Sequence, residues 1–230
     1  MRDWEVLFVA LFIAACHFIS PYIHQAFEKY RAAVISFTGG LAISYVFLHL
    51  IPELEDGFGL VGNRIYFIAL VGFIVFFGIE LIITRYQEPA EHTRFYVLHI
   101  SVAFIYTALT IFTLGMQLPT TSALTVVFAL SLGLHLMSND IGLQENFGSR
   151  YVRNGRYLLI LAVVLGSVLS IVRRPHEIVI DSLTAILAGF MLYKIFREQL
   201  PDIQQVRYLP FIAGIGIFLL LHILLDTTHR

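Results

Sequence analysis

Eight long apolar stretches, separated by short polar connections, limit what this chain can fold into. At a rise of about 1.5 Å per residue, roughly 20 mainly apolar residues cross the hydrocarbon core of a bilayer as a helix. The sequence therefore predicts an all-α membrane protein with eight transmembrane helices, forming a single transmembrane domain over residues 1–230. The predicted spans are residues 3–22, 31–54, 62–85, 94–117, 121–142, 155–174, 177–200 and 207–226.

The composition supports a chain embedded in lipid. Of its 230 residues, 58% are hydrophobic and 13% are charged, whereas soluble domains carry about 25% charged residues. The formal net charge of −1 does not favour nucleic acid as a partner, and the lipid bilayer is the expected one. Residues 55–59 and 153–155 are expected to be loops, because Gly, Asp and Asn favour turns.

The distribution of Lys and Arg predicts an orientation. Counted at the ends of the spans and in the connections, ten of these residues lie on one side and five on the other. Basic loop residues are retained on the cytoplasmic side. Together with the even number of spans, this bias predicts a multi-pass protein of the cell membrane with both termini outside. The basic pair Arg173–Arg174 lies on the side that opposes this rule.

Two predicted spans that run in opposite directions end in a similar phrase. Span two closes with FLHLIPE at residues 47–53, and span seven closes with FREQLPD at residues 196–202. The small pairs Gly39–Gly40 and Ala188–Gly189 precede these phrases and permit close helix contact. The pattern favours an inverted repeat, which in transporters has the substrate site between its units. A chance match of two proline-containing helix ends is the alternative.

Polar groups inside the spans indicate where chemistry could occur. Span five carries His135, Asn139 and Asp140, and span four carries His99. His135 and Asn139 are four residues apart and therefore share a helical face. Imidazole nitrogens with an amide oxygen or a carboxylate can bind a divalent transition metal such as zinc. Hydrogen bonding between helices is the other interpretation of the same residues.

The remaining histidines have simpler interpretations. His49 precedes Pro52 and Glu53 near the predicted outer face, where it is either an interfacial group or part of a metal entry path. His17 and His222 are interpreted as packing or interfacial groups. The single cysteine, Cys16, excludes an internal disulfide.

The chain resembles the ZIP family of divalent-metal transporters in three features. These are its eight predicted spans, its outward termini, and the phrase His49-Leu50-Ile51-Pro52-Glu53 after Gly39–Gly40. The second helix of that family typically carries His-Leu-Leu-Pro-Glu after a glycine pair. Glu80, and residues 189–193 followed by 200–202, resemble its third and seventh helices. The resemblance covers essentially the whole chain. It implies a ZIP-like bundle with an inverted repeat and a divalent metal ion as substrate.

The fourth helix departs from the family pattern. ZIP helix four usually reads His-Asn-x-x-Asp-Gly, and residues 99–104 here read HISVAF. The histidine is kept as His99, while Ile100 and Ala103 replace the asparagine and the carboxylate.

The fifth helix departs as well. ZIP helix five usually reads His-Glu-x-Pro-His-Glu, and residues 135–140 here read HLMSND. Span six has no acidic residue or histidine, although many members place a ligand there. The resemblance therefore implies one reduced metal site, with a second position lost. Its expected ligands are His99, His135 and Asn139, with Asp140 assisting and His49 at the entry.

Three functional hypotheses follow. The first is a ZIP-like permease for zinc or a related divalent transition metal, which is a substrate of the chain and not a cofactor. The second is a non-transporting ZIP-like scaffold or sensor, favoured by the lost ligands. The third is an intramembrane zinc hydrolase, with His135, Asp140 and either His222 or His229 holding the metal that activates water. The permease is the leading prediction, so the chain is not expected to be an enzyme. A homodimer stays open.

Overall fold

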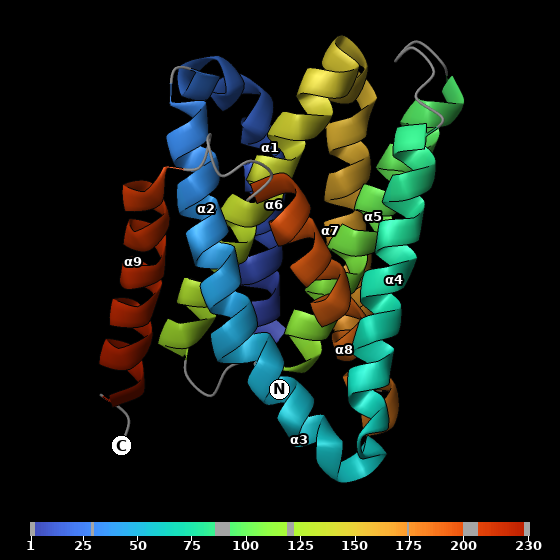
Figure 1. Ribbon diagram of the computed structural model, residues 1–230, viewed down its shortest axis with the longest axis vertical. Coiled ribbons are helices and arrows are strands. Elements are labelled where there is room, and N and C mark those ends of the chain that lie inside the picture. Colours follow the sequence, from blue (N-terminus) through green and yellow to red (C-terminus); the bar gives the residue numbers. More distant parts are fainter. Residues whose placement is uncertain are drawn as a thin grey trace.

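All regular secondary structure in the described part of the chain is helical, which confirms the expected all-α class (Figure 1). The computed structural model describes residues 3–28, 30–85, 93–118, 122–173, 175–199 and 207–227. In chain order the elements are α1 (Asp3–Glu28), α2 (Arg31–Tyr45), η1 (Val46–Leu50), α3 (Ile51–Val61), α4 (Arg64–Arg85), α5 (Thr93–Met116), α6 (Ser122–Arg150), η2 (Tyr151–Gly155), α7 (Arg156–Val172), α8 (Glu177–Lys194), η3 (Ile195–Gln199) and α9 (Tyr208–Thr227), where η denotes a π-helical turn.

Within the described residues, six helical stretches are long and apolar enough to cross a membrane. One of them, Ser122–Val172, includes both α6 and α7, which Figure 1 shows as two rods joined by a turn. The shorter apolar helix Tyr208–Leu224 lies within α9. Large apolar side chains such as Phe67 and Leu209 are exposed on the outside of the bundle. Water would solvate such a surface poorly, so it suits a multi-pass protein embedded in lipid.

The predicted loop at residues 55–59 is wrong, because the helix continues through Pro52 to Val61. In an α-helix, proline lacks an N–H and its ring clashes with the carbonyl four residues earlier. Here the preceding turn is widened into η1, and the N–H of Ile51 donates to the carbonyl oxygen of Val46. The wider turn accommodates the proline ring without ending the helix.

The predicted loop at residues 153–155 is also wrong. These residues belong to the π-helical turn η2, and α6 extends to Arg150. The reversal lies at Gly148, whose φ of 49° is in the left-handed region. Glycine enters that region without the steric cost of a Cβ atom. The chain therefore turns at a single glycine inside a stretch of otherwise helical residues.

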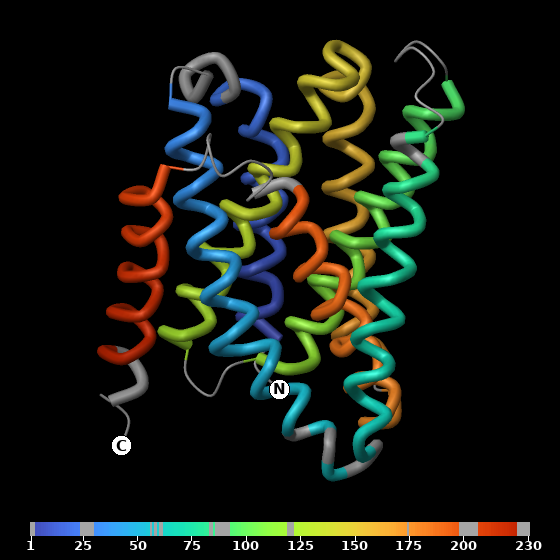
Figure 2. The backbone as a smooth tube through the Cα atoms, viewed as in Figure 1, coloured from blue at the N-terminus to red at the C-terminus, as the bar shows by residue number. Residues whose placement is uncertain are grey.

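The helices form two groups. In one group α1 packs on α6 and α7, and α5 packs on α7; in the other α2 packs on α9, and α4 packs on α8. Contacts of α2 with α6 and of α5 with α8 join the groups. Figure 2 shows this arrangement along the backbone, with α9 and α2 side by side at one edge.

Glycines bring the helices of the second group into backbone contact. In the α4–α8 pair, a Cβ atom on Gly189 would collide with the carbonyl oxygen of Ala69, and one on Gly72 with that of Ile186. Small residues at such positions let two helices approach closely, as in membrane helix pairs.

The α2–α9 pair repeats this geometry. A Cβ atom on Gly40 would collide with the carbonyl oxygen of Phe211, and one on Gly214 with that of Phe37. The turn η1 begins six residues after Gly40, just as η3 begins six residues after the corresponding glycine of α8. The turn η1 contacts α8, and η3 contacts α2. Figure 1 shows α2 and α8 running in opposite directions.

Candidate functional site

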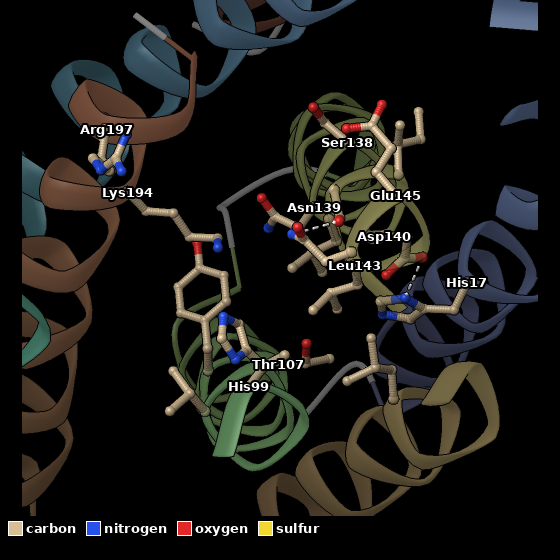
Figure 3. Close-up of a pocket in the computed structure, with 18 of the residues that line it drawn as sticks. His17, His99, Thr107, Ser138, Asn139, Asp140, Leu143, Glu145, Lys194 and Arg197 are labelled. Atoms are coloured by element: carbon tan, nitrogen blue, oxygen red, sulfur yellow. Dashed lines mark hydrogen bonds and ion pairs between the residues drawn. The ribbon is translucent and has the colours of Figure 1, made fainter. Parts of the chain in front are cut away.

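A cavity of about 380 Å³ lies between the two helix groups (Figure 3). It is lined from α1, α5, α6 and α7 on one side, and from α2, α4, α8 and η3 on the other. It reaches the surface at the end of the bundle where α2 begins and α8 ends, since Arg31 and Arg197 in its lining are exposed. Its polar lining residues are His17, Arg31, Glu80, His99, Tyr106, Thr107, Ser138, Asn139, Asp140, Glu145, Asn146, Lys194 and Arg197.

Three of the predicted metal ligands, His99, Asn139 and Asp140, line this cavity. The Nδ1–H of His99 donates to the carbonyl oxygen of Phe95 at 3.0 Å, which directs Nε2 away from its own helix turn. The ring of His99 also packs against the rings of Phe95 and Phe147, with centroids 4.3 Å and 5.1 Å away. An aromatic surround therefore orients this imidazole in the cavity wall.

His135 is fully buried and does not belong to the cavity lining. The hydroxyl of Tyr106 makes a hydrogen bond with its Nε2 at 2.9 Å. Because Tyr106 itself lines the cavity, His135 lies behind the wall rather than in it. Its observed role is the interhelical hydrogen bond that was the alternative interpretation.

His49 lies in η1 and is not part of the cavity either. Its ring packs against Tyr45 and Phe128, with centroid distances of 5.1 Å and 4.5 Å. Its Nδ1 is 3.8 Å from a carboxylate oxygen of Glu53, beyond hydrogen-bond length. The ring of His222 is nearly parallel to that of Phe128, with a centroid distance of 6.3 Å. These two histidines therefore belong to a separate aromatic cluster.

His17 has a different environment from the one expected for a packing group. Its Nδ1 is 2.8 Å from the Oδ2 atom of Asp140, and the side chains are 1% and 0% exposed. An ionised carboxylate only accepts hydrogen bonds, so Nδ1–H donates. Both residues line the cavity, one from α1 and one from α6. The signal was an ionisable side chain in the middle of a span, which is itself a reason to expect function.

Basic side chains also line the cavity, and sequence reasoning counted them only for topology. The ammonium of Lys194 lies 5.7 Å from the ring centroid of Tyr106 and 5.8 Å from that of Phe76. Cations at such distances are attracted to aromatic faces. Arg31 of α2 forms an ion pair of 2.5 Å with Glu145 of α6. The cavity therefore holds charges of both signs.

The predicted ligands are not gathered into one cluster. In the part of the chain that the structure describes, no three His, Cys, Asp or Glu side chains are close enough together to hold a metal ion. No protein-family model matches the chain, and no curated protein matches it. The resemblance to the ZIP family and the metal site therefore stay predictions. The geometry itself shows a polar cavity inside an apolar bundle, with two imidazoles and three carboxylates in its wall.

Proposed function

We propose that this chain is a ZIP-like permease that moves a divalent transition-metal ion, zinc or a related ion, through the cavity. The observation that carries the proposal is the position of the cavity, between two helix groups and lined by both. In carriers with alternating access, the substrate site lies between two units, and rocking of one against the other exposes it to each side in turn. A cavity that reaches one end of the bundle is one state of such a cycle.

The paired glycines support an inverted repeat as part of this proposal. Gly40 on α2 and Gly189 on α8 make equivalent backbone contacts, with α9 and α4 respectively. The turns η1 and η3 follow them at the same spacing. Exchanging α2 with α8 also exchanges α9 with α4, as two units related by a two-fold axis in the membrane plane require.

Eight membrane crossings follow if α6 and α7 cross separately and α9 is the eighth span. Arg31, Lys194 and Arg197 stand at the end of the bundle that the cavity reaches. Under the rule that basic residues stay inside, this end faces the cytoplasm. Both termini then lie outside, and the permease belongs to the cell membrane. A homodimer remains a prediction.

The chemistry of the lining favours a transition metal over calcium or magnesium. His17 and His99 offer imidazole nitrogens, while calcium and magnesium require cages of oxygen ligands. Asn139 and Asp140 add oxygen atoms in the same wall. An ion held by few protein atoms is bound weakly enough to be released, which conduction demands.

Uptake of Zn²⁺ into proteoliposomes tests the permease directly. Ala103 lines the cavity. We expect the Ala103→Phe variant to lower uptake by about tenfold or more, because the close-packed wall leaves the phenyl ring no room except in the cavity itself. The matched control is Ile105→Phe on the same helix, since Ile105 is 63% exposed and points outward. We expect this control to transport as well as the parent.

Two further variants test the predicted ligands. His99→Ala is expected to lower Zn²⁺ uptake, because His99 lines the cavity. His135→Ala is expected to lower the stability of the fold rather than to affect ion binding directly, because His135 is hydrogen-bonded behind the wall.

The Ala103→Phe variant provides the decisive result for the cavity. Normal uptake by this variant would show that ions do not pass through the cavity.

A non-transporting scaffold or sensor is the second candidate. The absence, within the described ranges, of three clustered metal-binding side chains favours it, as do Lys194 and Arg197, which repel cations. A folded parent that takes up no divalent ion would support this alternative. The hydrolase hypothesis has less support, since His222 packs on Phe128 outside the cavity and His229 lies outside the described residues.

A further inference from the structure

The second ring nitrogen of His17 is buried without a partner. His17 is 1% exposed, and its Nε2 makes no hydrogen bond to any described residue. Figure 3 shows the imidazole extending from α1 to the cavity edge, with one nitrogen bonded to Asp140 and the opposite edge of the ring turned inward. A buried polar atom without a partner is rare in folded proteins, and a bound water molecule or ligand commonly supplies the missing hydrogen bond or ligand contact.

The hydrogen bond to Asp140 decides what that nitrogen can do. When Nδ1–H donates to the carboxylate, the neutral imidazole carries its lone pair on Nε2. Histidines that bind metals are oriented in this way, with the other ring nitrogen donating to a carboxylate. The donor pair of His17 and Asp140 is therefore already in the metal-binding arrangement, at a distance of 2.8 Å.

Other atoms beside this pair also lack partners. Oδ1 of Asp140 and the side-chain nitrogen of Asn139 are buried, and neither has a partner at full hydrogen-bond geometry within the described part of the chain, although the hydroxyl of Tyr151 lies beside Asp140. Asp140 and Asn139 line the same cavity as His17. The polar wall beside the pair can therefore bind water molecules that accompany an ion in the cavity.

We infer that His17, through Nε2, is the principal nitrogen ligand of the transported metal ion, and that Asp140 is its positioning residue. This inference rests on the proposed function for the identity of the ion as cargo. It reverses the roles expected from the sequence, in which Asp140 assisted binding and His17 packed. Water completes the coordination, together with oxygen atoms of the cavity wall.

Cobalt binding to the full chain in detergent tests the site without transport. Co²⁺ reports nitrogen ligation through its visible absorption and takes the place of zinc at such sites. We expect one Co²⁺ per chain for the parent. The His17→Ala variant should lose affinity by about tenfold or more, and Asp140→Asn by about 10–100-fold, as for other carboxylates that orient a metal-binding histidine.

The comparison variant is His99→Ala, which removes the other imidazole of the cavity. Its Nδ1–H donates to a backbone carbonyl and not to a carboxylate, so we expect it to lose less Co²⁺ affinity than His17→Ala does. The matched control is His222→Ala, which removes an imidazole outside the cavity and should change the affinity by less than about threefold. If His17→Ala does not fold, His17→Gln replaces it, because the glutamine amide can still donate to Asp140 but offers no imidazole nitrogen.

Parent-like affinity in the folded His17 variant would overturn the inference, as would an equal or larger loss in His99→Ala. The permease proposal fails separately. Co²⁺ binding that depends on His17, in a parent that takes up no ion into proteoliposomes, would refute transport while the site stands. Uptake that continues in His17→Ala would refute the site while transport stands.

Discussion

The carbonyl oxygen of Ala69 in α4 lies so close to Gly189 in α8 that a Cβ atom on this glycine would collide with it. The two backbones therefore meet without a side chain between them. In lipid, where apolar burial adds little to helix association, close packing of this kind is a main source of affinity between helices. The contact thus holds α8, which carries Lys194 into the cavity, against α4.

Substituting Gly189 by alanine is expected to destabilise the protein by about 1–3 kcal/mol, the usual cost of overpacking. Thermal unfolding in detergent measures the effect. The control is Gly78→Ala in α4, where a Cβ atom meets no atom of the described residues within 4 Å. Alanine in a helix there should be neutral or stabilise by about 0.5–1 kcal/mol. Equal destabilisation by both variants would contradict the assigned contact.

Removing the hydroxyl of Tyr106 tests its hydrogen bond to His135. Tyr106→Phe should cost about 1–3 kcal/mol, because a buried ring nitrogen loses this partner. Tyr208→Phe serves as the control, since Tyr208 is 71% exposed. Chemical denaturation in mixed micelles provides the comparison. A Tyr106→Phe variant as stable as the control would mean that the bond contributes nothing.

The ion pair of Arg31 and Glu145 is expected to be weak. The side chains are 51% and 32% exposed, and exposed pairs contribute about 0.2–1 kcal/mol. A double-mutant cycle with Arg31→Ala and Glu145→Ala measures the coupling energy. That energy should fall further in about 1 M salt, where screening acts within roughly 3 Å. A larger, salt-independent coupling would show that the pair is shielded from solvent.

Cysteine labelling tests whether α7 crosses the membrane. In a Cys16→Ser background, cysteines are introduced singly at Asn154 and His176, exposed positions on either side of α7. A membrane-impermeant maleimide should label the His176→Cys variant in intact cells. The Asn154→Cys variant should react only after permeabilisation. Labelling of both variants in intact cells would show that α7 does not cross the membrane. The reverse pattern would show that the orientation is opposite to the proposed one.

Hydrophobic length predicted the helices better than it predicted their ends. The helix after Arg31 passes through Pro52 because η1 widens the turn, and composition does not reveal such a local adjustment. The turn near α7 lies at Gly148, not at residues 153–155. Residues such as Gly, Asn and Asp favour turns, but the packing of neighbouring helices decides at which of them the chain reverses direction.

The candidate site was predicted only in part, for a similar reason. His99, Asn139 and Asp140 belong to the cavity, while His135 is hydrogen-bonded behind its wall. His17 was missed as a site residue because its partner is 123 positions away in the chain. Spacing within one helix indicates a shared face, but it does not indicate which other helix meets that face.

The sequence by itself determined that the chain is helical and suited to lipid, because apolar length and the need to satisfy backbone hydrogen bonds leave few alternatives. It also marked the span that carries Asn139 and Asp140 as polar. Only the tertiary structure decided that His17 is the partner of Asp140 and that Lys194 shares their cavity. Such pairings depend on which helices are neighbours and how closely they pack. Glycine contacts such as that of Gly189 with Ala69 allow the close approach of individual helix pairs.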